Sequence, residues 1–145
     1  MLKSILVSSD LSTRSKPAVQ RGVQLAEASG AALCVLHVVE DDLLEDRMRD
    51  EIRSAEDYLT KQFAGFGKPP ACDVAVAMGH ACHVIAEEAR AREADLIIMG
   101  AHRRQFLRDV LVGTTIERVT RTGGRPVLMA NSKTGERWRK VFIAT

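Results

Sequence analysis

A basic loop between a predicted strand and a predicted helix carries the residues of this chain most suited to binding an anion. The apolar run at residues 96–99 ends at Gly100, and Gly113-Thr114-Thr115 leads into a predicted helix at residues 116–121. A junction of this kind presents backbone N–H groups and the positive end of a helix dipole to a ligand. Three arginines in the loop add positive charge that suits phosphate, namely Arg103, Arg104 and Arg108. We therefore predict a nucleotide or another phosphorylated small molecule as the ligand.

The elements that must position this loop alternate between strands and helices. Pro17 suits the first turn of one predicted helix, and Gly30 is placed to end it. Strands are predicted at residues 4–9, 32–39, 72–77, 95–99 and 125–130, and helices at residues 16–29, 41–66, 79–92 and 116–121. The alternation predicts an α/β fold, an open doubly wound five-stranded parallel sheet with helices on both faces.

Apolar residues at helical spacing predict the face that each helix turns toward the sheet. The second helix is long and amphipathic, and the third is short. The inward residues are predicted to be Ala18, Gly22, Leu25, Ala26 and Ser29 in the first helix, Leu44, Met48, Ile52, Ala55, Leu59 and Phe63 in the second, and Ala81, Ile85 and Ala89 in the third.

Asp10 follows the first predicted strand and is a candidate ligand-binding carboxylate. Ligands of doubly wound sheets bind beyond the carboxyl ends of the strands, where the strand order reverses. If the first three strands run outward, the fourth returns beside the first, so that Asp10 lies opposite Gly100. A carboxylate there suits a ribose hydroxyl, while Gly100, Arg103 and Gly113 suit the phosphates. The alternative role for Asp10 is that of a helix cap or turn residue.

Composition bounds the class of protein. The chain has 145 residues, 46% of them hydrophobic and 28% charged, which fits one globular domain. A net charge of +2 gives no support for nucleic-acid binding. No apolar run approaches the ~20 residues that cross a bilayer, and a strand-like segment follows Met1 directly. We expect a cytoplasmic protein with neither nucleic acid nor membrane as a partner.

The cysteine and histidine content does not indicate a metal site. Cys34, Cys72 and Cys82 form no Cys-x-x-Cys pair and are expected to be reduced and mostly buried. His80 and His83 lie three residues apart, and with Cys82 they could face one side of a helix. Metal sites normally need three or four ligands with supporting groups. A surface pair at a helix start is therefore the favoured interpretation, and no metal is required.

Several segments match a known family in order and spacing. They are Ile5-Leu6-Val7 before Asp10 and Ser12, residues 35–39, Met78-Gly79 before Ile85 and Ala89, residues 95–100, residues 113–119 and residues 125–128. Together they resemble a universal stress protein domain over residues 3–130, with a Rossmann-like nucleotide-binding fold. The resemblance implies that Asp10 faces the ribose of ATP, that Val38 meets the adenine, and that the phosphates lie along Gly100, Gly113, Thr114 and Thr115. Met99, at the end of the strand before Gly100, is also a predicted nucleotide-binding residue.

One position departs from the ATP-binding pattern of that family. The pattern has glycine, two residues, glycine, nine residues, glycine and then serine or threonine. Gly100, Gly113 and Thr114 fit it, but Arg103 occupies the second glycine position. Glycine permits a positive φ and close approach of the backbone to phosphate, which arginine opposes. Either the guanidinium group of Arg103 replaces the backbone contacts with phosphate, or the site has lost ATP. The presence of Arg103, Arg104 and Arg108 favours retained anion binding.

The C-terminal residues suggest a second repeat. Residues 139–145 resemble residues 2–9, and a polar linker at residues 131–136 precedes them. We interpret residues 1–131 as the universal stress protein-like domain and residues 132–145 as a linker with a strand-like tail. This tail is the start of a second repeat, an additional edge strand that packs Trp138 and Phe142 across a dimer interface, or a coincidental match.

Association is expected through the last strand of the domain. Residues 127–130 form a short apolar outer strand, and such an edge pairs readily unless it is covered. The family resemblance implies antiparallel pairing of this strand with its equivalent in a second domain. We therefore expect a homodimer, or pairing with a second repeat in the same chain.

Two functions remain open, and neither is enzymatic. The chain lacks a Gly-x-Ser-x-Gly elbow, a Walker lysine–threonine pair and a Cys–His pair in context. His102 is expected to contact phosphate or solvent, because no catalytic partner is evident; weak ATP hydrolysis is the most we expect. The first function is a stress-response regulatory domain that binds nucleotide and acts through dimerisation. The alternative is a dimerisation module that works through protein partners without a nucleotide.

Overall fold

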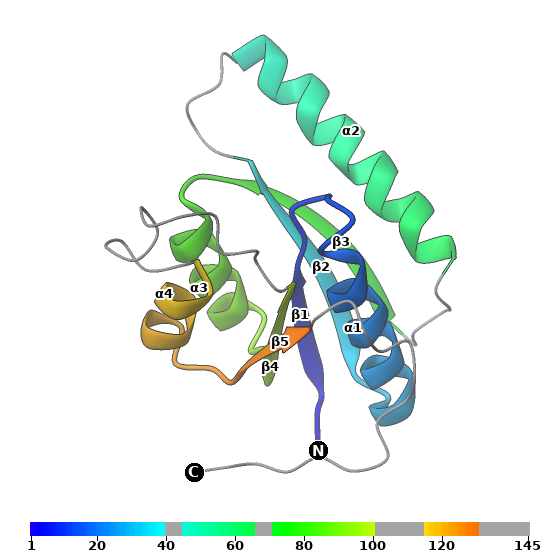
Figure 1. Ribbon diagram of the computed structural model, residues 1–145, viewed down its shortest axis with the longest axis vertical. Coiled ribbons are helices and arrows are strands. Elements are labelled where there is room, and N and C mark those ends of the chain that lie inside the picture. The colour runs from blue at the N-terminus through cyan, green and yellow to red at the C-terminus, as the bar shows by residue number, and fades with distance from the viewer. Residues whose placement is uncertain (40–44, 66–70, 101–114, 131–145) are drawn as a thin grey trace.

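The fold is an open parallel sheet with helices on both faces (Figure 1). The computed structural model describes residues 1–39, 45–65, 71–100 and 115–130. The strands lie in the order β3-β2-β1-β4-β5, and every neighbouring pair is parallel, which confirms the predicted sheet and the return of the fourth strand beside the first. The elements are β1 (Ser4–Ser8), α1 (Lys16–Ser29), β2 (Ala32–Val39), α2 (Glu45–Ala64), β3 (Ala71–Met78), α3 (Ala81–Ala91), β4 (Leu96–Gly100), α4 (Thr115–Thr122) and β5 (Val127–Ala130).

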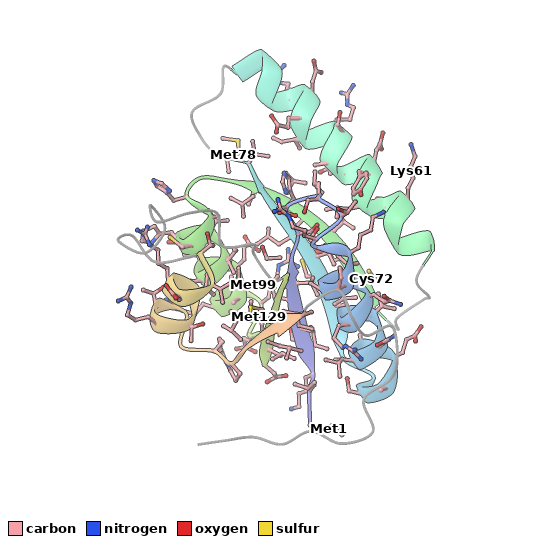
Figure 2. All side chains as sticks on the ribbon, viewed as in Figure 1. Met1, Lys61, Cys72, Met78, Met99 and Met129 are labelled. Carbon is pink, nitrogen blue, oxygen red and sulfur yellow. The ribbon has the colours of Figure 1, made fainter. Side chains whose placement is uncertain are left out.

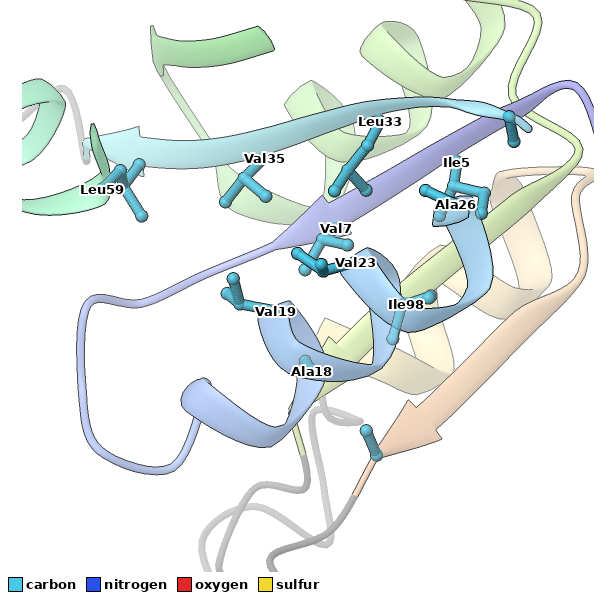
Figure 3. Packing of buried hydrophobic residues seen from close by; sticks show 12 residues of the cluster. Ile5, Val7, Ala18, Val19, Val23, Ala26, Leu33, Val35, Leu59 and Ile98 are labelled. Atoms are coloured by element: carbon cyan, nitrogen blue, oxygen red, sulfur yellow. The ribbon is translucent and has the colours of Figure 1, made fainter. Parts of the chain in front are cut away.

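The central strands are apolar along their length because helices cover both of their sides. In β1, Ile5 and Val7 face a core shared with α1, and Leu6 between them faces a core shared with α3 and α4. Strand side chains alternate between the two faces of a sheet, so a strand buried on both faces reads as an unbroken apolar run. Figure 3 shows the first core, in which Val19 and Val23 of α1 pack over the sheet.

Helix α1 is buried over a wider arc than its predicted face. The structure confirms Ala18, Gly22 and Ala26 as buried, but Leu25 and Ser29 are only half-buried. Three further residues of α1 are buried instead, namely Val19, Arg21 and Val23. The reason is that α1 lies against the central strands β1 and β4 and also contacts β2 and β5. Its outer face is therefore narrower than that of a helix at the edge of the sheet.

The ends of several elements differ from the predicted bounds for local reasons. Gly79 has a φ of 127°, so α3 begins at Ala81 rather than at Gly79. Asp95 was expected within the fourth strand but precedes β4, and its Oδ2 accepts hydrogen bonds from the backbone N–H groups of Lys3 (2.7 Å) and Ser4 (3.1 Å). These backbone hydrogen bonds hold the pKa of Asp95 below its ordinary value. Asp95 thus fixes the start of β1 beside the start of β4.

Two strands form the edges of the sheet, as the crossover argument predicts. Strand β5 is outermost beside β4, and β3 is outermost beside β2. Each edge strand carries an exposed methionine, Met129 (58% exposed) on β5 and Met78 (47%) on β3 (Figure 2). Among the helices of the described ranges, none is long and apolar enough to cross a membrane.

Candidate functional site

A cavity opens at the carboxyl ends of β1, β2 and β4, where the strand order reverses. Its volume is about 250 Å³, near the lower end of the range for small-molecule sites (~300 Å³). Asp10 and Gly100 both line it, as the crossover argument predicts. The starts of α1, α3 and α4 also reach the cavity. The lining residues are Ser8, Ser9, Asp10, Arg14, Ser15, His37, Val38, Ala81, Ile85, Met99, Gly100, Thr115 and Ile116.

The structure brings part of the predicted site together in this cavity. Five residues singled out from the sequence line it: Asp10, Val38, Met99, Gly100 and Thr115. The other five lie outside the described residues: His102, Arg103, Arg104, Gly113 and Thr114. Gly100 and Thr115, the described residues nearest to those five in the chain, both line the cavity.

The loop after β1 holds Asp10 through hydrogen bonds from Ser12. The Oδ1 atom of Asp10 accepts one bond from the Ser12 backbone N–H (3.0 Å) and one from the Ser12 hydroxyl (2.6 Å). Partial burial acts to raise the pKa of Asp10, but the hydrogen bonds from Ser12 and Ser15 and, to a smaller extent, the charge of Arg14 outweigh it, so that the pKa is lowered. Asp10 therefore presents a carboxylate at neutral pH, which can accept hydrogen bonds from a ligand.

A chain of hydroxyl groups fixes the same loop against α1. The Ser15 hydroxyl donates to the Ser12 carbonyl oxygen (2.9 Å), so the Ser9 hydroxyl must be the donor in the bond between Ser9 Oγ and Ser15 Oγ (3.0 Å). Ser9 Oγ also accepts from the Leu11 N–H (3.2 Å). Leu11 has a φ of 59°, a left-handed conformation that costs a leucine about 1–2 kcal/mol. These bonds hold the loop in that conformation.

His37 joins the loop to β2 and was assigned no role from the sequence. Its Nδ1 lies 2.9 Å from the Ser9 carbonyl oxygen, which can only accept, so Nδ1 carries the proton. In the neutral imidazole, Nε2 is then an acceptor. The signal in the sequence was a polar residue near the carboxyl end of an otherwise apolar strand. Ser9, Arg14 and Ser15 also line the cavity, but their proximity depends on the fold and has no comparable signal.

The cavity has an apolar side and a polar side. The apolar residues Val38, Ile85, Met99 and Ile116 belong to the core beneath α3 and α4. Ile85 was expected to pack inward, and it is both buried in that core and part of the cavity wall. The polar residues lie on the loop that leads into α1 and on β2. A flat heterocycle fits the first side, and hydroxyl or phosphate groups fit the second.

A second cavity of about 360 Å³ lies at the opposite, amino ends of β1, β2 and β3. Its charged residues are already paired: Arg92 Nη1 lies 2.8 Å from Asp73 Oδ2, and Arg92 Nε lies 2.9 Å from Glu88 Oε2. Although this cavity is larger, it lies away from the switch point at which doubly wound sheets bind ligands. The cavity at the carboxyl ends is therefore the better candidate for a ligand site.

The cysteines are free, as expected, but they are not uniformly buried. Cys34 is buried and Cys82 is half-buried, whereas Cys72 is exposed because it lies on the edge strand β3. Burial raises the pKa of the Cys34 thiol to about 12, and partial desolvation together with the neighbouring Asp73 carboxylate raises the pKa of Cys72 to about 11. Both thiols are therefore protonated at neutral pH and weakly nucleophilic.

The two histidines at the start of α3 form a surface pair. His80 and His83 are exposed, and their ring centroids lie 6.4 Å apart in an edge-to-face arrangement. Within the described ranges, no three His, Cys, Asp or Glu side chains are grouped so that they could hold a metal ion.

Comparison with known proteins finds similarity both in sequence and in fold. The model of the Universal stress protein family matches residues 1–131. A protein of Thermus aquaticus, named "Universal stress protein in QAH/OAS sulfhydrylase 3'region", is 27% identical over 136 residues, covering 89% of this chain and 98% of that protein. The crystal structure of a universal stress protein in complex with cAMP is 23% identical, with 90% and 97% of the two chains covered and a TM-score of 0.69. Universal stress protein UspA from Lactobacillus plantarum is 27% identical, with 90% and 98% covered and a TM-score of 0.69.

Proposed function

Because the chain belongs to the universal stress protein family, we propose that it is a stress-response regulatory domain that binds an adenine nucleotide such as ATP. The observation that carries this proposal is the cavity itself. It combines the Asp10 carboxylate, a glycine (Gly100) whose backbone a phosphate can approach closely, the start of α4 at Thr115 and an apolar wall. One structural relative is described as a complex with cAMP, which contains adenine, ribose and phosphate. No catalytic role is proposed for any of these residues.

In this proposal each part of the nucleotide has its own contact. The base lies against Val38 and Met99, and the ribose hydroxyls donate to Asp10. The phosphates lie near Gly100 and Thr115, where the first turn of α4 offers backbone N–H groups and the positive end of its dipole. His102, Arg103, Arg104, Gly113 and Thr114 complete the phosphate side in the proposal.

Replacing Asp10 with alanine is expected to weaken ATP binding about tenfold or more, because hydrogen bonds to a charged group contribute roughly 1.5–3 kcal/mol. Calorimetric titration should compare ATP with 2′,3′-dideoxy-ATP, which lacks both ribose hydroxyls. The wild type should prefer ATP, and Asp10→Ala should show no preference.

Asp57→Asn on the exposed face of α2 removes the same charge and should keep the wild-type preference. Equal loss of preference in both variants would show that net charge, rather than a contact with ribose, determines binding.

We further propose that the chain forms a homodimer by antiparallel pairing of β5 with its copy. Strand β5 is at the edge of the sheet, and Met129 on it is 58% exposed. An unprotected edge presents unpaired backbone groups to another strand. Pairing with a second repeat would use the same edge; residues 132–145, which lie outside the described residues, would supply the linker to such a repeat and its first strand.

Met129→Lys is expected to convert the dimer to a monomer at micromolar concentration, because it places a charged side chain from each copy on the edge strand that the proposal pairs. Sedimentation velocity measures this change. Met78→Lys, on the opposite edge strand, is the matched control and should remain dimeric. A monomeric wild type would contradict the proposed dimer.

The alternative function is a dimerisation module that works through protein partners without a nucleotide. It shares the β5 edge with the first proposal but gives no role to Asp10 or to the cavity. The presence of a charged, hydrogen-bonded carboxylate in a partly apolar cavity favours the nucleotide-binding function.

A further inference from the structure

Arg14 is a cation in the cavity wall for which neither the sequence pattern nor the family match supplies a role. It lies in the short loop between β1 and α1 and is exposed. Loop arginines are commonly solvated and without function. Arg14 differs from such residues in its position, because two observations relate it to other residues of the cavity, the first to Gly100 and the second to Asp10.

The first observation concerns Gly100, at the end of β4. A Cβ atom built on Gly100 would lie 2.8 Å from the Arg14 carbonyl oxygen and 3.1 Å from the Ser15 Cα. The backbone of Arg14 is therefore packed directly against the residue that begins the phosphate side of the proposed site.

The second observation concerns Asp10. The positive charge of Arg14 is close enough to lower the pKa of the Asp10 carboxyl. In the described part of the chain, no carboxylate or carbonyl group accepts a hydrogen bond from the Arg14 guanidinium. Its N–H groups are thus able to donate to a ligand in the cavity that Arg14 lines with Asp10 and Gly100.

We propose that Arg14 binds the phosphate attached directly to the ribose and makes the cavity selective for phosphorylated nucleosides over nucleosides. This inference rests on the proposed function. If Asp10 holds the ribose and Gly100 begins the phosphate side, the group between them is the first phosphate. A guanidinium suits it because its planar fork of donors matches two phosphate oxygens.

Arg14 also resolves an electrostatic conflict in the site. A phosphate placed near the Asp10 carboxylate is repelled, since like charges at short range interact more strongly near a protein surface than in bulk water. Asp10 and Arg14 are the charged residues among the described lining residues. Arg14 offsets the charge of Asp10 and leaves the carboxylate able to accept from the ribose.

Calorimetric titration of the full chain with ATP, AMP and adenosine tests this role. Arg14→Ala should weaken ATP and AMP about tenfold or more and by the same factor, because both carry the first phosphate, and adenosine should change less than about twofold. Arg14→Lys should recover part of the affinity for AMP, since an ammonium group supplies charge without the fork. Lys16→Ala removes an equal charge from an exposed residue two positions along and should bind all three ligands as the wild type does.

Three outcomes would overturn the inference. Arg14→Ala could bind AMP as tightly as the wild type does, which would mean that Arg14 is a solvated residue without a role in binding. The affinity of Arg14→Ala for adenosine could fall as much as its affinity for AMP, which would mean that the substitution alters the cavity as a whole. Thermal unfolding of each variant shows whether the fold is preserved. Failure of the wild type to bind any of the three ligands would contradict the proposed function itself, and that result is distinct from the other two.

Discussion

Gly100→Ala is expected to lower the free energy of unfolding by about 1–3 kcal/mol and to weaken ATP binding at least tenfold. The new Cβ would lie 2.8 Å from the Arg14 carbonyl oxygen and 3.1 Å from the Ser15 Cα. Both neighbours are backbone atoms, so no side-chain rotation relieves the contact. The end of β4 and the start of α1 must separate, and both line the cavity. Urea unfolding and calorimetric titration with ATP measure the two effects.

Gly30→Ala is the matched control for this variant. Gly30 ends α1 with a φ of 72°, and no atom lies within 4 Å of a Cβ built on it. Alanine there is destabilised by the left-handed conformation, by about 1 kcal/mol, without contact with the cavity. Gly30→Ala should therefore lose stability but bind ATP as the wild type does. Equal ATP affinity in Gly100→Ala and Gly30→Ala would show that this cavity is not the ATP site.

Gly22→Ala is expected to destabilise the fold by about 1–3 kcal/mol even though alanine is favoured over glycine in a helix by about 1 kcal/mol. A Cβ on Gly22 would collide with Val7 Cγ2 and lie 3.2 Å from Leu33 Cδ1. Val7 is completely buried, and a β-branched side chain has few rotamers with which to move aside. Glycine at this position allows α1 to lie directly on β1.

A double-mutant cycle tests the cause of that destabilisation. Val7→Ala removes the methyl group that Gly22→Ala would contact and leaves a cavity of its own. The double variant should therefore be at least as stable as Val7→Ala alone, with a coupling of about 1 kcal/mol or more between the two sites. Urea unfolding of the four proteins gives the coupling. Simply additive losses would place the effect of Gly22→Ala elsewhere than at Val7.

The arrangement of the sheet could be predicted from the sequence because it follows from few rules. Apolar runs define β1 and β4, and the handed crossovers then require β4 to return beside β1. That single inference places Asp10 opposite Gly100, and the structure finds both in one cavity. Strand β5 at the edge follows from the same ordering.

The remaining features of the site depend on contacts between distant residues, which no local pattern reports. Arg14 is indistinguishable in sequence from any loop arginine until the backbone of Gly100 is packed against it. His37 belongs to a strand whose other residues are apolar, and its bond to Ser9 joins residues 28 apart. The burial of Arg21 likewise depends on the central position of α1 over the sheet. Helical periodicity alone could not indicate how far round the helix its burial extends.

The central claim is that the cavity at the carboxyl ends of the strands binds a phosphorylated ribonucleotide. NMR measurement of the amide chemical shifts of the full chain during titration with ATP tests this claim most directly. The account predicts saturable changes, with a dissociation constant of about 1 mM or tighter, at the residues that line the cavity, including Asp10, Val38, Gly100 and Thr115. Residues of the opposite cavity, such as Cys34 and Asp73, should not change. An absence of saturable changes at millimolar ATP, or changes confined to the opposite cavity, would contradict it.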